Sequence, residues 1–166
     1  AKQSTDTKKI GNFGGGGGGT SSVLNFTRNS LNSGYFAMAS KLDICDINKV
    51  ADRMGVTLAN GGKVTDENVP FDVLGPKNIS PLAMANAYAT VASGGTYCTP
   101  RAIDRVVGTD GQERELPASS CTEGVISPEV AATAAFALQS VMGGGGTGSR
   151  ANTNDGTPLI GKTGTH

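Results

Sequence analysis

The sequence lacks an excess of charge of either sign, a metal-binding cluster of histidine and cysteine, and any long hydrophobic run. Its 14 lysines and arginines balance 14 aspartates and glutamates, so the formal net charge is zero. A nucleic-acid-binding domain would show a basic excess, and the balance argues against that partner. The only histidine is the last residue and no C-x-x-C pair occurs, so no zinc-site pattern is present.

No apolar stretch approaches the roughly 20 residues that cross a bilayer, and no signal-peptide pattern is present. The chain nevertheless opens abruptly at Ala1 and stops at His166. We therefore expect it to be part of a longer protein, about whose anchor these absences say little. Its 166 residues, 37% of them hydrophobic, are enough for one modest domain with its own core.

Glycine is the most unusual component, with 25 residues, six of them in the run Gly14 to Gly19. Residues 1–20 show no hydrophobic periodicity and end in this run, which predicts a flexible loop or linker. A phosphate-binding loop would need a Gly-Lys-Ser/Thr ending, and the residues after the run supply no lysine. We expect residues 21–166 to form the folded part.

Residues 21–166 predict helices with a few strands between them. The first expected elements are two helices within 22–42 with a break at 29–33, and a helix capped by Asp46 and ended by Gly55. A loop over 56–78 and a helix over 80–93 follow. We then expect strands over 97–107 and 112–116 joined by a turn at Asp110-Gly111, a helix over 127–142, and a strand over 157–165. The buried faces of the last two helices are expected to be Leu82, Ala85, Ala89 and Ala92, and Val130, Ala134, Leu138 and Val141. This order predicts an α/β (α+β layered) domain.

The segment Lys162-Thr163-Gly164-Thr165 ends the last expected strand and could hold a carboxylate. Lys162 supplies a positive charge, Thr163 and Thr165 supply hydroxyls, and Gly164 lets a ligand backbone approach closely. A Lys-Thr-Gly at a strand end is usually a solvated turn, so the segment alone is weak evidence.

A second polar pattern, Ser30-Leu31-Asn32, lies at the expected break between two helices. It offers a hydroxyl and a side-chain amide, although such residues at a helix break are usually only caps. Their order gives the two patterns more weight. Penicillin-recognising serine acyltransferases carry Ser-x-x-Lys, Ser-x-Asn and Lys-Thr-Gly in that chain order, and the second and third occur here once each.

Longer segments carry a more specific resemblance: 79–95 (ISPLAMANAYATVASGG), 97–103 (YCTPRAI), 126–132 (ISPEVAA) and 160–165 (IGKTGT). From about residue 22 to its end, the chain resembles the transpeptidase domain of high-molecular-mass penicillin-binding proteins, most strongly the class A bifunctional type. The resemblance implies the fold shared by penicillin-binding proteins and serine β-lactamases. We expect this fold to be incomplete here, with helices packed on a mainly antiparallel sheet.

One family motif is missing, because no Ser-x-x-Lys, which carries the nucleophilic serine, occurs in this chain. The segment Thr5-Asp6-Thr7-Lys8 has the spacing but the wrong first residue, and no apolar helix follows it. We expect the nucleophile on the remaining part of the same transpeptidase domain, and we expect the chain alone to be inactive.

The resemblance implies a D,D-transpeptidase that cross-links peptidoglycan stem peptides through an acyl-serine intermediate and is inhibited by β-lactams. Ser30, Asn32 and Lys162 are then expected to be catalytic, and Thr163, Gly164 and Thr165 to bind substrate. Neither a metal nor an organic cofactor is implied. The expected partners are D-Ala-D-Ala ends of stem peptides and β-lactams, without nucleic acid. The implied location is the extracytoplasmic face of the bacterial membrane, with the anchor outside this chain.

Other functions predict different observations. An inactive or sensor-type β-lactam-binding domain of the same fold would be acylated without transfer, or not acylated. A D,D-carboxypeptidase or β-lactamase is a further option, but a β-lactamase needs a base for deacylation and no candidate stands out. A purely structural interaction domain predicts that Ser30, Asn32 and Lys162 do not share a cleft.

The three cysteines leave a disulfide open. The implied family works outside the cytoplasmic membrane, where disulfides persist, and Cys98 and Cys121 flank the expected hairpin. A disulfide between them and two unpaired thiols remain equal alternatives. Cys45, at an expected helix start, is expected to be a buried thiol.

Overall fold

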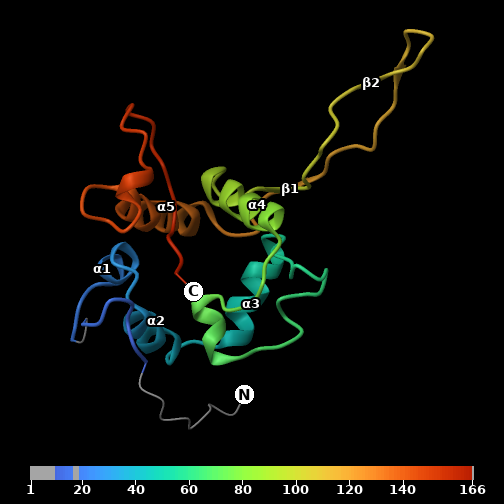
Figure 1. The fold of residues 1–166 in the computed structure, drawn as a ribbon. Helices are drawn as coiled ribbons and strands as arrows, with labels where there is room; N and C mark the ends of the chain where they lie inside the picture. The colour runs from blue at the N-terminus through green and yellow to red at the C-terminus, as the bar shows by residue number, and fades with distance from the viewer. Residues whose placement is uncertain (1–9, 17–18, 166) are drawn as a thin grey trace.

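The computed structural model describes residues 10–16 and 19–165, which form helices joined by long loops and small antiparallel sheets (Figure 1). In chain order the elements are α1 (Val23–Arg28), α2 (Asn32–Ala39), α3 (Ile44–Arg53), the 3-10 helix η1 (Pro70–Leu74), α4 (Pro81–Ala92), β1 (Tyr97–Cys98), β2 (Val106–Val107), β3 (Glu113–Arg114), β4 (Cys121–Thr122), α5 (Pro128–Met142) and the 3-10 helix η2 (Ser149–Ala151). The expected break between the first two helices is confirmed. None of the helices in this described part is long and apolar enough to cross a bilayer.

Polar caps explain where several helices begin. Ser80 and Ser127 cap α4 and α5 by accepting a backbone N–H, and each is followed by a proline at the first helical position, as expected. The expectation for α3 is wrong, because Asp43 is its cap and accepts from the backbone N–H of Cys45 at 2.8 Å. Asp46 lies instead in the first turn, where a negative charge is also favourable, and pairs with Lys49 at 2.9 Å.

The core is a small cluster beneath α4. Buried Val56, Val64 and Ala87 form it, and partly buried apolar residues pack around it: Ala51, Met54, Leu58 and Ile79. Much of this cluster comes from the segment 56–78, which the sequence predicts as loop alone. The segment also contains η1, whose Phe71 ring meets that of Phe36 edge to face, with centroids 5.1 Å apart.

Helix α4 buries a different face from the expected one. Ala83, Ala87 and Thr90 are buried, whereas Leu82 is 63% exposed and the other expected positions are also exposed. Few of its residues are strongly polar, so periodicity does not select a face and the neighbouring core does. Thr90 can be buried because its hydroxyl donates to the carbonyl of Asn86 at 2.9 Å.

Helix α5 follows the expected face only in part. Val141 is fully buried, but Val130 is 55% exposed, and Ala131 takes its place with no exposed surface. Both α1 and α4 pack against α5, so the neighbours again choose which small residue is buried.

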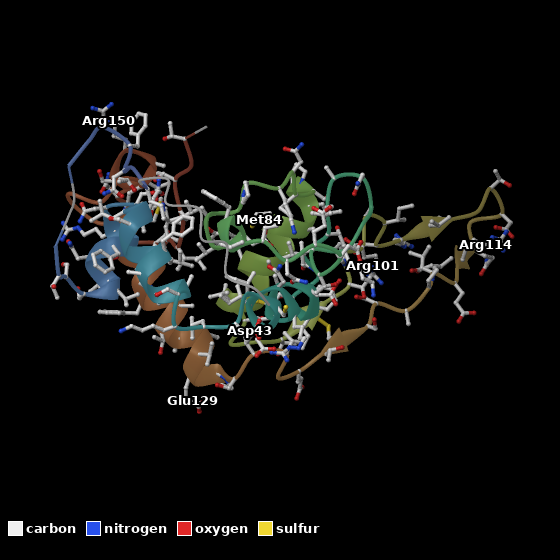
Figure 2. The ribbon with its side chains drawn as sticks, turned by 90° about the horizontal axis from the view of Figure 1, so that it is seen from below. Asp43, Met84, Arg101, Arg114, Glu129 and Arg150 are labelled. Atoms are coloured by element: carbon white, nitrogen blue, oxygen red, sulfur yellow. A yellow bond between two sulfur atoms is a disulfide. The ribbon has the colours of Figure 1, made fainter. Side chains whose placement is uncertain are left out.

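The strand expected over 97–107 is wrong as a single element. Tyr97–Cys98 pairs antiparallel with Cys121–Thr122, and Val106–Val107 pairs with Glu113–Arg114. Pro100 lies between the two short ladders and cannot donate to a ladder hydrogen bond. The hairpin projects from the helical body, with Arg101 near its base and Arg114 near its far end (Figure 2). The expected turn is confirmed at Gly111, whose φ is +75°.

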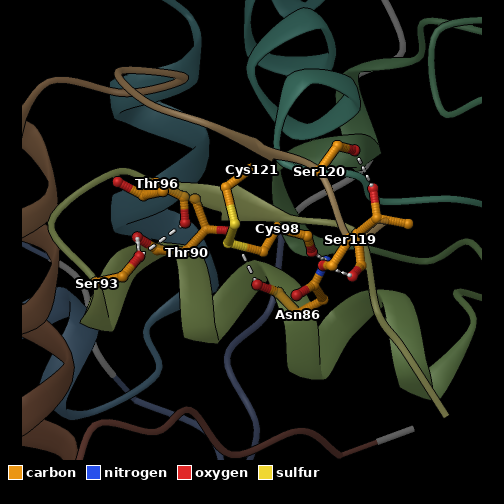
Figure 3. The surroundings of a disulfide bond; sticks show 9 residues. Asn86, Thr90, Ser93, Thr96, Cys98, Ser119, Ser120 and Cys121 are labelled. Carbon is orange, nitrogen blue, oxygen red and sulfur yellow. Dashed lines mark hydrogen bonds between the residues drawn. A yellow bond between two sulfur atoms is a disulfide. The ribbon is translucent and has the colours of Figure 1, made fainter. Parts of the chain in front are cut away.

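Cys98 and Cys121 form a disulfide across β1 and β4, where they are direct partners in the ladder (Figure 3). Asn86 of α4 donates its side-chain N–H to the carbonyl of Cys98 at 3.0 Å, so the base of the hairpin is joined to α4. Cys45 is a free thiol but only half-buried, against the expectation of a buried one.

The segment 157–165 is not the expected strand. It has no ladder partner within the described residues, and an extended segment becomes a strand only when a neighbour offers its backbone groups. In Figure 1 this red segment descends past α5 toward the centre of the molecule.

Candidate active site

Ser30 lies in a strained turn at the end of α1. The N–H of Leu31 donates to the carbonyl of Phe26 at 2.9 Å, and that of Ser30 donates to Thr27 at 3.2 Å. These two bonds form a Schellman motif, in which the residue at the position of Ser30 is usually glycine because its φ is positive. Ser30 has a φ of +54°, so the backbone carries strain at a residue that offers a hydroxyl.

Lys162 reaches Ser30 across 132 residues of sequence. Its Nζ donates to Ser30 Oγ at 2.7 Å and to the carbonyl of Thr163 at 2.9 Å. An ammonium group has donors and no acceptor. Ser30 Oγ must therefore accept from Lys162, which leaves the hydroxyl hydrogen of Ser30 available for a third group.

These groups line a cleft with a volume of about 290 Å³. The lining residues come from the junction of α1 and α2, from η1, α4 and α5, and from the C-terminal segment: Ser30, Leu31, Asn32, Tyr35, Val73, Leu74, Tyr88, Leu138, Lys162, Thr163, Gly164 and Thr165. Ser30, Asn32 and Lys162 thus share one cleft, an arrangement that the purely structural alternative excludes. Thr163, Gly164 and Thr165 line the same cleft.

Lys162 gives the cleft a positive charge. None of the lining residues in the described part of the chain is acidic, so no carboxylate there neutralises it. Partial burial lowers the pKa of Lys162 because the charged form loses hydration. An ammonium in this position attracts a ligand carboxylate and releases a proton more readily than an exposed lysine does.

Asn32 begins α2 and is held from outside the helix. Its Nδ2 donates to the carbonyl of Gly11 at 3.0 Å, and since an amide nitrogen carries two hydrogens, one remains for another acceptor. Asn12 receives the N–H of Ser33 at 3.1 Å, which caps an orphan donor of the first helical turn. Residues 11 and 12 therefore hold the start of α2, where Asn32 was expected to be catalytic.

Two tyrosines, Tyr35 and Tyr88, also line the cleft, and neither was expected as a site residue. The hydroxyl of Tyr35 lies 2.6 Å from that of Thr27, which donates to the carbonyl of Val23. Since Thr27 has a single hydroxyl hydrogen, Tyr35 is the donor, and the bond ties α2 to α1 across the break. Burial, and secondarily the neighbouring Tyr35, raises the pKa of Tyr88. Neither tyrosine belongs to the Ser-x-Asn or Lys-Thr-Gly pattern, so no local signal marked them.

Comparison with protein families matches residues 2–166 to the penicillin binding protein transpeptidase domain. The chain belongs to this transpeptidase family. The match spans both motifs in the cleft, and it confirms the resemblance carried by the longer segments. The helices and small antiparallel sheets agree with an incomplete version of the expected α/β fold.

The chain is similar to several curated proteins of this family. It is 34% identical over 170 residues to penicillin-binding protein 1A of Mycolicibacterium smegmatis, in an alignment that covers 95% of this chain and 21% of the relative. It is 32% identical over 121 residues to penicillin-binding protein 1A of Mycobacterium tuberculosis, and that alignment covers 64% of this chain and 14% of the relative. A protein of the same name from Clostridium botulinum is 28% identical over 136 residues, which cover 82% of this chain and 16% of the relative. The chain thus spans about a fifth or less of the length of these relatives.

Two expectations about the N-terminal region remain predictions. The segment Thr5 to Lys8, with the spacing of the missing motif, lies outside the described residues. The linker boundary at residue 20 is also untested, although Gly11 and Asn12 contact the start of α2.

Proposed function

We propose that this chain forms the substrate-docking side of a D,D-transpeptidase site that cross-links peptidoglycan stem peptides and is inhibited by β-lactams. The observation that carries the proposal is the hydrogen bond from Lys162 to Ser30, inside a cleft of a transpeptidase-family chain. The nucleophilic serine and its lysine belong to the remaining part of the domain. Without them we expect the chain alone not to be acylated.

The proposed reaction has two steps. The serine gives its proton to the lysine of its own motif as its oxygen attacks the carbonyl carbon of the penultimate D-Ala. The peptide C–N bond breaks, and the terminal D-Ala leaves as an amine after gaining a proton. The amine of a neighbouring stem then attacks the ester carbon and loses a proton, the C–O bond to serine breaks, and the serine oxygen regains a proton. A β-lactam follows the first step, but its own amine stays attached and the acyl-enzyme persists.

Ser30 and Lys162 would move the proton in the first step. Ser30 accepts from Lys162 and can donate its own hydrogen to the leaving nitrogen, after which Lys162 can replace that hydrogen. The lowered pKa of Lys162, caused by burial, makes this replacement easier, because general acids work best with a pKa nearer the working pH.

The other residues would hold the substrate. Asn32 has an N–H available for a backbone carbonyl of the stem peptide. Thr163 and Thr165 would donate hydroxyl hydrogens to the terminal carboxylate, and Gly164 allows the substrate backbone to approach. The backbone N–H of Thr165 would stabilise the oxyanion together with the N–H of the nucleophilic serine, a contribution of about 10²–10³ in rate for such a donor.

The proposed setting is the extracytoplasmic face of the bacterial membrane, where stem peptides with D-Ala-D-Ala ends are available. The Cys98–Cys121 disulfide supports this setting, because disulfides persist in oxidising compartments.

Lys162 provides the test of the proposal. In the full-length protein that carries this chain, Lys162→Ala should slow acylation by a fluorescent penicillin by at least about 10-fold, or about 1.4 kcal/mol. Lys162→Arg should also be slower than wild type, because a planar guanidinium does not release a proton and does not replace a compact ammonium. Lys41→Ala, at an exposed lysine outside the cleft, is the matched control.

The outcomes separate the alternatives. If Lys162→Ala is acylated at the wild-type rate with an unchanged melting temperature, Lys162 takes no part and the proposal fails. Wild-type protein that is acylated but forms no cross-linked product would instead favour the sensor-type domain.

A further inference from the structure

The loop after α5 folds back on the end of its own helix and leaves little room for a side chain at Gly146 or Gly148. A Cβ on Gly146 would lie 2.2 Å from the carbonyl oxygen of Val141, and one on Gly148 would lie 2.9 Å from the sulfur of Met142. The N–H of Gly148 donates to the carbonyl of Val141 at 2.9 Å. The residue between these two glycines, Thr147, is therefore held in a defined place.

Thr147 contacts the end of α1, just before the first motif, and Thr163 of the second motif. Its N–H donates to the carbonyl of Arg28 at 3.2 Å, two residues before Ser30. Arg28 returns a bond from its guanidinium to the carbonyl of Gly144. The hydroxyl of Thr147 lies 2.7 Å from that of Thr163, the residue after Lys162. Thr147 does not line the cleft itself, so it can act only through these neighbours.

The direction of the hydroxyl bond decides what Thr163 can do. A carboxylate only accepts hydrogen bonds, so Thr163 can hold one only by pointing its single hydroxyl hydrogen at it. Either hydroxyl of the 2.7 Å pair can be the donor, but if Thr163 gives its hydrogen to a carboxylate, Thr147 must donate to Thr163. A hydroxyl that accepts one bond also donates a second more strongly.

We propose that Thr147 is a positioning residue that orients the hydroxyl of Thr163 toward the ligand carboxylate. The inference rests on the proposed function, since it concerns the same cleft. It adds a residue outside the cleft to which neither sequence motif points, and it gives the Gly-Thr-Gly of residues 146–148 a role. The glycines let the loop pack closely against the end of α5. This packing fixes Thr147, whose hydroxyl contacts that of Thr163.

The test compares Thr147→Val, which keeps the shape of the side chain and removes the hydroxyl, with Thr147→Ser, which keeps the hydroxyl. Acylation kinetics of the full-length protein are measured with benzylpenicillin and with its methyl ester, which lacks the carboxylate charge. Thr133→Val is the matched control, because the exposed hydroxyl of Thr133 bonds only within α5, to the carbonyl of Glu129 at 2.7 Å.

For Thr147→Val we expect initial binding of benzylpenicillin to weaken by about 5- to 10-fold, in the range of a neutral hydrogen bond such as the one between Thr147 and Thr163. The limiting acylation rate should change by less than about 2-fold, and the ester should lose little, since the lost interaction belongs to the carboxylate. Thr147→Ser and Thr133→Val should resemble wild type. A crystal structure of Thr147→Val should show the Thr163 hydroxyl rotated away from its wild-type direction.

Several results would overturn the inference while leaving the proposed function intact. These are unimpaired binding by Thr147→Val, an equal loss in Thr147→Ser, an equal loss for penicillin and ester, or an unchanged Thr163 rotamer. If Thr147→Val does not fold, Thr147→Ala takes its place in the same comparisons. Failure of the wild-type protein to be acylated at all would overturn the proposed function, and the inference with it.

Discussion

Ser30 has a proposed role in proton transfer and a strained backbone, and two substitutions separate these two properties. Ser30→Ala and Ser30→Gly both remove the hydroxyl and its bond from Lys162. They differ in the backbone, because only glycine adopts the φ of +54° without a Cβ penalty. Of the two variants, Ser30→Gly should therefore be the more stable, and both should be slow to acylate.

The magnitude follows from two opposing effects. A residue with a Cβ in the left-handed region costs about 1–2 kcal/mol. Glycine loses more backbone freedom on folding, which offsets about 0.5–1 kcal/mol of that relief. Ser30→Gly should thus be more stable than Ser30→Ala by about 0.5–1 kcal/mol. Loss of a general acid typically slows a reaction by about 10²–10⁴-fold, and we expect a loss of about 10²-fold in both variants.

The assay pairs denaturant unfolding of the transpeptidase domain with its rate of labelling by a fluorescent penicillin. Asn154 provides a matched control, because it and Ser30 are the two non-glycine residues with positive φ in the described chain. Asn154→Gly should be more stable than Asn154→Ala, as at position 30, but neither change should alter the labelling rate, since Asn154 does not line the cleft.

Two results would refute this reasoning. If Ser30→Gly is less stable than Ser30→Ala, the turn at the end of α1 is not strained by its side chain. If Ser30→Ala is labelled at the wild-type rate, Ser30 does not relay a proton, whatever the stability.

Two further predictions concern stability alone. Replacing Cys98 and Cys121 by serine should lower the free energy of unfolding by about 3 kcal/mol in the chain-entropy model, whereas Cys45→Ser should change it little; equal urea midpoints with and without reductant would contradict this. Asp72→Asn should lower the free energy of unfolding by about 3 kcal/mol. The buried Asp72 carboxylate pairs at 3.2 Å with the largely buried ammonium of Lys77, which would lose its ion-pair partner. Asp46→Asn, at an exposed ion pair, should leave the urea midpoint nearly unchanged. An equal effect of the two substitutions would show that the buried Asp72–Lys77 pair does not stabilise the fold.

Several helix termini could be predicted because their causes are local. Ser80 and Ser127 each precede a proline, and both begin helices where expected. The expected break at 29–33 appears between α1 and α2. In each case a few neighbouring side chains compete for the same backbone groups, and that competition can be read from the sequence.

Other features depend on neighbours that periodicity does not contain. The buried face of α4 was misassigned because its residues are small and apolar nearly all round, and the contact with Val56 and Val64 makes the choice. The strand expected over 157–165 failed for a related reason, since no described segment pairs with it. Nor could the sequence indicate that η1 would bring Val73 and Leu74 to the cleft.

The site itself lies between these two cases. The types of residue in the Ser-x-Asn and Lys-Thr-Gly patterns could be recognised, but the 2.7 Å contact between Ser30 and Lys162 spans 132 positions and depends on how α1 and the loop after α5 meet. Positive φ at Ser30 was also not foreseeable, because local preference favours glycine there. A local rule broken at a residue that touches the cleft is what selection for a function would produce. Glycine would form a purely structural turn of this kind without strain, so the φ of +54° at Ser30 supports the proposed relay through an observation separate from the motif.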